Sequence, residues 1–227
     1  MKKYLLSIII LSLSYFSATA HVEHYQKYDF LDYDLFRNDK KIGQHKYIFD
    51  RNNEKLEVKS IVNFKITKLG VDLYKYNAVS SEVYKNNQFH SFTSKTKQNK
   101  KDKYVNIKVK GNNSDLIIDG SSYKGNTSNK FIVGTWWNHE IIEAKAQISA
   151  ISGRIINQNV KFIGKEIIKI NGKEYKALHF NFSSSDKNLP EKKKLNTDIW
   201  YEENTYLWLK ASFNKQGRWE YRLKNFK

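Results

Sequence analysis

The chain has 227 residues, a formal net charge of +17 and no cysteine. Without cysteine it can form no disulfide, zinc–thiolate site or cysteine nucleophile, so its stability must come from a hydrophobic core. Only five of the 40 basic residues are arginine. Surfaces that read phosphates favour the arginine fork, so we expect no specific nucleic-acid partner and retain an anionic membrane surface as a partner for the lysines.

Residues 1–20 have the three parts of a secretory signal peptide. Two lysines form the positive start, an apolar run spans 5–16, and Ala18-Thr19-Ala20 provides small residues for cleavage. The run is shorter than the roughly 20 apolar residues that span a bilayer. We therefore expect export to the periplasm and a soluble mature chain that begins at His21.

The first half of the remaining chain alternates apolar and polar residues between short turns. Alternation is clearest from Leu56 to Ile66, with Val58, Val62 and Phe64 on the same face. A period of two over this length excludes a helix and suggests a strand bent around a curved sheet. Strands are expected at 28–37, 42–49, 56–66, 73–84, 89–96, 104–110 and 116–118, followed by a loop with a weak strand at 121–129.

Residues 133–142, with the sequence VGTWWNHEII, interrupt the strand pattern. We interpret them as a plug or rim where two halves of a β-structure meet. Adjacent side chains on an extended backbone point to opposite sides, so one of Trp136 and Trp137 should face inward and the other should lie at the rim. Residues 144–152 are compatible with one or two helical turns or with an irregular link.

The strand pattern restarts after Gly153 and continues to the end of the chain. Asn171-Gly172 is a strong hairpin signal, and a turn is also expected at Gly164. A mobile surface loop is expected at 183–194. Strands are expected at 155–163, 167–170, 175–182, 198–202, 207–214 and 218–226.

These patterns predict a mainly all-β fold. A single strongly curved antiparallel sheet would form a half-barrel or open barrel, with one or two short helices near 136–152. No proline- or glycine-rich linker divides the chain. We therefore expect a single β domain over residues 21–227, present as a monomer.

Several segments carry a resemblance to known proteins. They are 42–49 (IGQHKYIF), the Tyr74-x-Tyr76 strand leading to Glu82, 133–138, and the C-terminal pieces 198–201, 217–218 and 221–223. In order and spacing they resemble a family of exported bacterial proteins known only as a domain of unknown function, which implies no activity and no catalytic residues. Where family members often have tryptophan two residues after the glutamate, this chain has Tyr84. The layout is also similar to periplasmic lipoprotein carriers, whose half-barrel surrounds acyl chains, but a shared fold does not imply a shared function.

Aromatic residues give the main indication of a ligand site. Half-barrels that hold a ligand line their cavity with aromatic side chains and a few polar groups. The predicted function is non-catalytic binding of an apolar or amphipathic ligand such as a lipid, without a cofactor. Trp208 and Trp219 are instead expected in the core. The aromatic candidates for the site are Tyr74, Tyr76, Trp136, Trp137 and Trp200.

Glu82, Asn138, His139 and Arg218 are the polar candidates. An inward-facing Glu82 would need a partner such as Arg218 or Arg222, so a structural ion pair is predicted, with Arg218 otherwise solvated after its turn. An enzyme that uses Glu82 and His139 on a small apolar substrate in the same cavity is one alternative, although no triad spacing supports it. An outer-membrane-associated structural protein is another, which the lysines on both strand faces disfavour.

No metal site is predicted. The amine of a mature His21 together with the His24 imidazole could hold copper, but two histidines near a terminus arise easily by chance. The sequence has no His-Glu-x-x-His motif, no carboxylate metal cluster and no glycine-rich phosphate loop.

Overall fold

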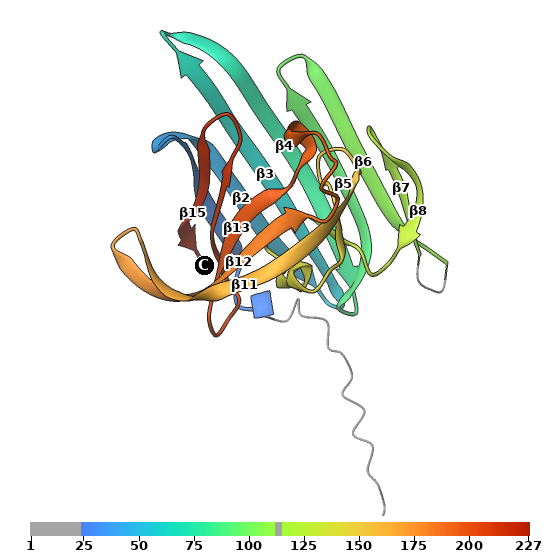
Figure 1. Ribbon diagram of the computed structural model, residues 1–227. Helices are drawn as coiled ribbons and strands as arrows, with labels where there is room; N and C mark the ends of the chain where they lie inside the picture. The colour runs from blue at the N-terminus through green and yellow to red at the C-terminus, as the bar shows by residue number, and fades with distance from the viewer. Residues whose placement is uncertain (1–23, 112–114) are drawn as a thin grey trace, which may run out of the picture.

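The computed structural model describes residues 24–111 and 115–227, which form an open, curled sheet of 15 strands (Figure 1). The strand order is β8-β7-β6-β5-β4-β3-β2-β1-β15-β14-β13-β12-β11-β10-β9, so the two ends of the chain meet where β1 pairs with β15. Neighbouring strands are antiparallel except β9 and β10. The predicted fold class is confirmed. The predicted signal peptide and the mature terminus at His21 lie outside the described residues.

The strands of the first half are β1 (Phe30–Arg37), β2 (Lys40–Asn52), β3 (Lys55–Lys68), β4 (Val71–Lys85), β5 (Gln88–Gln98), β6 (Lys101–Lys110), β7 (Asp115–Gly120) and β8 (Lys124–Ser128). The second half has β9 (Ile132–Val133), β10 (Ala146–Ile148), β11 (Ile155–Ile170), β12 (Lys173–Ser184), β13 (Asn196–Glu202), β14 (Trp208–Asn214) and β15 (Arg218–Phe226). Two short 3₁₀ helices are η2 (His139–Ile142) and η3 (Glu191–Lys193). Within the described ranges, no helix reaches the length and apolarity needed to cross a membrane.

Two local predictions are corrected by the strand pairing. The expected turn at Gly164 is wrong, because β11 continues through it and pairs with β12 along its length; Gly164 lies beside an irregularity after Phe162 instead. Residues 146–148 form strand β10, and the short helix lies earlier, at η2, within the predicted range of 136–152.

The core fills one part of the sheet's inner face. Trp137, Trp208, Tyr33 and Tyr47 are almost completely buried there, so the core position predicted for Trp208 is confirmed. Trp219, expected in the core as well, is only half-buried. A second cluster packs β5, β6 and β7 against β9 and β10 and includes Phe92, Ile107, Ile118 and Ile148. Burial of these clusters is what holds the two halves of the curled sheet together.

Gly43 allows β2 to approach β3 closely where it pairs with Phe64. A Cβ atom at this position would lie 2.1 Å from the carbonyl oxygen of Asn63 and 2.4 Å from Cβ of Phe64. Both neighbours belong to the paired strand, so they cannot move aside without disturbing the sheet.

We therefore predict that Gly43→Ala lowers the free energy of unfolding by about 1–3 kcal/mol, the usual cost of overpacking. Denaturant titration would measure it. Gly164→Ala is the matched control, because no atom lies within 4 Å of a Cβ there. Its expected effect is under about 1 kcal/mol. Equal stability of the Gly43→Ala variant and the wild type would contradict the steric argument.

Candidate ligand-binding site

The two adjacent tryptophans diverge, as predicted. Trp137 is fully buried, with its ring edge-on to Tyr25, Phe49 and Tyr84 at centroid distances of 5.3, 5.5 and 5.9 Å. Trp136 is half-buried, and its ring contacts Trp208 at 5.5 Å. Its φ of 59° lies in the left-handed region, which is disfavoured for residues with a Cβ atom. This backbone conformation turns the Trp136 ring away from that of Trp137.

Tyrosine hydroxyls hold this backbone in place. Tyr201 Oη donates a 2.9 Å hydrogen bond to the carbonyl oxygen of Trp136, and Tyr47 Oη donates to that of Thr135. Both tyrosines are completely buried, so their hydroxyls have little alternative to these acceptors. The segment is thus tied to β2 and to β13 at once.

Glu82 fastens the same segment to β4. Its carboxylate accepts hydrogen bonds from Tyr84 Oη at 2.5 Å, Trp137 Nε1 at 3.0 Å and Thr135 Oγ1 at 3.2 Å. Tyr84 Oη in turn accepts a 3.3 Å hydrogen bond from Asn138 Nδ2. The side chain of Glu82 is buried, and burial raises its pKa from 4.5 to about 7 despite the three donors.

The predicted ion pair between Glu82 and Arg218 or Arg222 is wrong. Both arginines bind Asp39 and Glu220, with Arg218 Nη2 2.9 Å from Asp39 and 3.0 Å from Glu220. Arg218 alternates along β15 with Trp219, which contacts Phe64 on the inner face. It therefore points to the outer face of the sheet.

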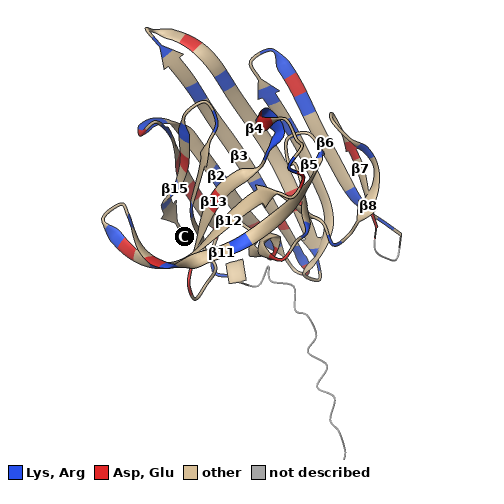
Figure 2. Ribbon diagram, viewed as in Figure 1, with Lys and Arg blue, Asp and Glu red and all other residues tan. Residues whose placement is uncertain are grey.

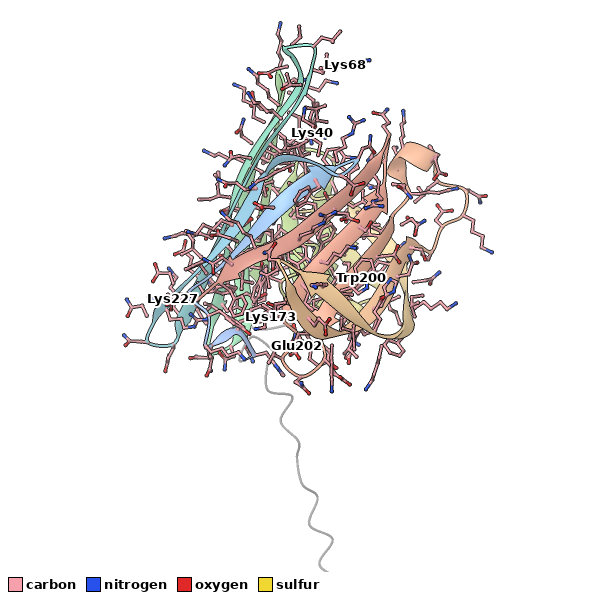
Figure 3. The ribbon with its side chains drawn as sticks, turned by 90° about the vertical axis from the view of Figure 1, so that its left-hand side faces the viewer. Lys40, Lys68, Lys173, Trp200, Glu202 and Lys227 are labelled. Atoms are coloured by element: carbon pink, nitrogen blue, oxygen red, sulfur yellow. The ribbon has the colours of Figure 1, made fainter. Side chains whose placement is uncertain are left out.

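Trp200 is buried, but it points to the outer face. It alternates with Ile199, which pairs with Phe180, and Lys210 lies 4.7 Å from its ring centroid on the outer side. Its Nε1 donates a 2.5 Å hydrogen bond to Glu166, and its ring stacks on His179 at 4.2 Å. The label in Figure 3 marks its position. Trp200 and Arg218 are thus separated by the sheet from Tyr74 and Tyr76.

His139 is buried at the start of η2, where its ring stacks on Tyr206 at 4.5 Å and meets the edge of His24 at 4.9 Å. Asn138 precedes it and caps η2, accepting a hydrogen bond from the Glu140 amide at 3.0 Å. Asn138 also lines a groove of about 770 Å³ with Tyr84, Phe89 and other residues near the β4–β5 turn. Tyr84 in this groove is eight residues along β4 from Tyr76, which corresponds to a distance of roughly 25 Å.

Tyr74 and Tyr76 belong to an aromatic cluster on the inner face beyond the core. Phe64 on β3 stacks on Tyr76 at 4.7 Å, lies 5.9 Å from Tyr74 and meets Trp219 edge-on at 5.3 Å. We call this cluster the aromatic wall. It consists of Phe64, Tyr74, Tyr76, Phe213, Trp219 and Tyr221.

The wall is continuous across the junction of the two chain ends. Pairing of β4, β3, β2, β1 and β15 places Tyr76, Phe64, Gly43, Leu35 and Tyr221 on one row. All members of the wall except Tyr76 keep part of their surface exposed. Trp136 contacts Tyr221 at 5.5 Å and so forms the base of the wall.

The side chains next to the wall are small and partly exposed. They are Val62, Ala78 and Ser80, on the inner faces of β3 and β4. The inner face is therefore tightly packed on the Trp137 side of Trp136 and less covered on the side of the aromatic wall.

Sequence reasoning missed Phe64, Phe213 and Tyr221 as members of this surface. The alternation in β3 assigns Phe64 to the apolar face, but not to any particular neighbours. Within residues 24–111 and 115–227, no group of three or more histidine, aspartate or glutamate side chains is placed to hold a metal.

Comparison with known proteins agrees with this architecture. A family model described as Domain of unknown function (DUF6134) matches residues 33–224, and no curated protein matches the sequence. The chain is similar to the crystal structure of a β-barrel-like protein of domain of unknown function DUF1849 from Brucella abortus, with a TM-score of 0.59 and 12% identity over 87% of this chain and 95% of that chain. The match to a DUF1329 family protein from Desulfovibrio piger covers 92% of this chain and 90% of that chain at 10% identity. Its TM-score of 0.27 is too low to indicate a shared fold. The first likeness concerns the fold alone.

The buried carboxyl group of Glu82 should make stability depend on pH. Between pH 4.5 and about 7 the unfolded chain is ionised at this position while the folded protein keeps the proton, so stability falls as pH rises through this window. Glu82→Gln cannot titrate. We predict that the stability of the wild type relative to this variant falls by about 3 kcal/mol from pH 4.5 to 7.5.

Denaturant titrations of both proteins at several pH values would measure this difference. The comparison is needed because His45 has the opposite effect. Burial lowers the pKa of His45 from 6.5 to about 3, so its contribution to stability is lost as pH falls below 6.5. His45 is present in both proteins and cancels. A difference that does not change with pH would show that Glu82 is ionised when folded.

Proposed function

The chain belongs to the DUF6134 family, and we propose that it binds an apolar or amphipathic molecule, such as a lipid, on the aromatic wall without catalysing a reaction. The observation that carries this proposal is the partial exposure of Phe64, Phe213, Trp219 and Tyr221 in the middle of a sheet. Apolar surface in contact with water is stabilised when a ligand covers it, by about 25 cal/mol per Å². A contiguous apolar surface often marks such a site.

The neighbouring small residues support the same proposal. Val62, Ala78 and Ser80 leave room in front of β3 and β4, while the rings of Phe64 and Tyr76 stand beside them. Ligand sites generally combine aromatic walls with such space and a few polar groups. A flexible acyl chain would fit a surface of this kind without needing directional hydrogen bonds.

Arg37 suits the polar end of an amphipathic ligand. It pairs with Trp219 across β1 and β15, and its guanidinium lies 5.9 Å from the Trp219 ring centroid. Its Nη2 donates to the carbonyl oxygen of Gln216, and the rest of the side chain is partly exposed. A carboxylate or phosphate at this edge of the wall would gain a charge-assisted hydrogen bond.

The proposal changes the set of residues expected to contact the ligand. Tyr74, Tyr76 and Trp136 stay in it, with Phe64 and Trp219 added. Glu82 and Trp137 act instead by holding the base of the wall, since both are buried and hydrogen-bonded to each other. We further propose, from the sequence, that the protein is exported to the periplasm and acts as a monomer.

Quenching by a brominated fatty acid would test this site. We predict that 9,10-dibromostearate, but not stearate, quenches the tryptophan fluorescence of the purified protein saturably, because Trp136 and Trp219 lie at the wall. A Trp136→Phe/Trp219→Phe double variant should lose most of this quenching. Bromine quenches only at close range, so the effect reports contact.

Trp200→Phe is the matched control, since Trp200 lies on the outer face and should not report the ligand. Quenching that survives in the double variant, or that is lost in the Trp200→Phe variant, would contradict a site on the aromatic wall. Absence of saturable quenching in the wild type would contradict the binding of fatty acids.

A further inference from the structure

The turn between β3 and β4 exposes an aliphatic side chain in an unusual backbone conformation. Leu69 and Gly70 have φ angles of 50° and 78°, which correspond to a turn that favours asparagine followed by glycine. Asn171 and Gly172 have nearly the same angles, 51° and 82°, in the β11–β12 hairpin. Leucine is therefore not the residue that the turn itself requires. Its side chain is 93% exposed.

The apolar surface continues along β4. Val71 and Leu73 are 61% and 54% exposed, so three aliphatic side chains face water within five residues. Asn99 of the β5–β6 turn hydrogen-bonds to the backbone of Leu73 and Lys75, which places that turn beside β4, short of the β3–β4 turn. We call this surface the β3–β4 tip, formed by Leu69, Val71 and Leu73.

Lysines surround the β3–β4 tip. Lys65, Lys68 and Lys75 are exposed on its own hairpin, and Lys100 and Lys101 are exposed on the adjacent one. Of the acidic residues nearby, Asp72 is bound by Lys65 at 3.8 Å and by Lys75 at 3.1 Å. Asp102 is exposed on the adjacent hairpin. Figure 2 shows a red segment among the blue ones at each hairpin end. The apolar side chains thus lie beside five lysines and two aspartates, so the surface carries a net positive charge.

The tip projects from the molecule. β3 and β4 extend beyond the strands beside them (Figure 1), and Lys68 lies farther out than Lys40 of the β1–β2 turn (Figure 3). A projecting surface of three aliphatic residues is too small and convex to bury the roughly 800 Å² that each partner contributes to a standard protein interface. It is suited to insertion between the headgroups of a bilayer.

We propose that the β3–β4 tip docks on an anionic membrane surface. Leu69, Val71 and Leu73 enter the boundary between headgroups and acyl chains, while the surrounding lysines contact the phospholipid phosphates. Apolar burial and attraction to anionic lipid act together in such interfacial binding. Exposed leucine in place of asparagine at the turn is explained by this role.

This inference does not rest on ligand binding at the aromatic wall. Tyr74 follows Leu73 directly, so a docked tip would bring the wall close to the membrane. Loss of docking through the tip should nevertheless leave dibromostearate quenching unchanged. The two proposals can therefore fail separately.

Co-sedimentation with vesicles would test the docking. Wild-type protein should bind vesicles of phosphatidylcholine with phosphatidylglycerol and not those of phosphatidylcholine alone. Leu69→Asn should lower the partition coefficient roughly tenfold, because it removes one inserted aliphatic side chain. Its melting temperature should equal or exceed that of the wild type, since asparagine suits the left-handed conformation.

Ile167→Thr is the matched control. Ile167 is 67% exposed on β11, between Lys165 and Lys169, and threonine is well tolerated in strands. This variant should bind vesicles as the wild type does. The proposal is overturned if Leu69→Asn binds as well as the wild type, if Ile167→Thr loses as much binding, or if the wild type does not bind anionic vesicles.

Discussion

The buried carboxyl group of Glu82 determines how the rest of the inner face is arranged. It receives hydrogen bonds from Trp137, Thr135 and Tyr84, which come from two parts of the chain about 50 residues apart. An unpaired carboxylate would be costly in this setting, so the three donors cannot easily be given up. The segment around Trp137 is held against β4 as a result, and it closes the packed part of the curled sheet.

The position of the segment around Trp137 determines where the aromatic wall begins. The left-handed backbone of Trp136 directs its ring away from Trp137, and the ring contacts Tyr221 at the base of the aromatic wall. Beyond Trp136, no segment of residues 24–111 or 115–227 covers Phe64 or Trp219 completely, as their partial exposure shows. One molecule thus combines a solid core with an accessible aromatic surface. The β3–β4 tip lies at the end of the two strands that carry Phe64, Tyr74 and Tyr76.

The strands could be predicted because period-two alternation and asparagine turns are local signals. The alternation from Leu56 to Ile66 identified β3, and Asn171-Gly172 identified the β11–β12 hairpin. The turn predicted at Gly164 is wrong because a glycine at a strand irregularity and a glycine in a turn have the same local signature. The turn at Leu69 and Gly70 falls between the predicted strands 56–66 and 73–84, but no local pattern predicts its exposed leucine, since leucine is not a turn residue.

The candidate site was less predictable because it depends on long-range register. Phe64 and Tyr221 share a row only because β1 pairs with both β2 and β15, which join opposite ends of the chain. The predicted partner of Glu82 is an arginine, whereas its donors are Tyr84 on the same strand and Thr135 and Trp137, whose position against β4 no local pattern specifies. The outer-face positions of Arg218 and Trp200 likewise depend on strand pairing that no local pattern specifies.

The account depends on an aromatic surface that stays accessible until an apolar molecule covers it. Native mass spectrometry of the protein purified from its own host tests this most directly. The account predicts a bound apolar or amphipathic adduct that organic solvent removes and that a Phe64→Asp variant fails to retain. Protein recovered without any adduct, or an adduct that the Phe64→Asp variant retains, would contradict it.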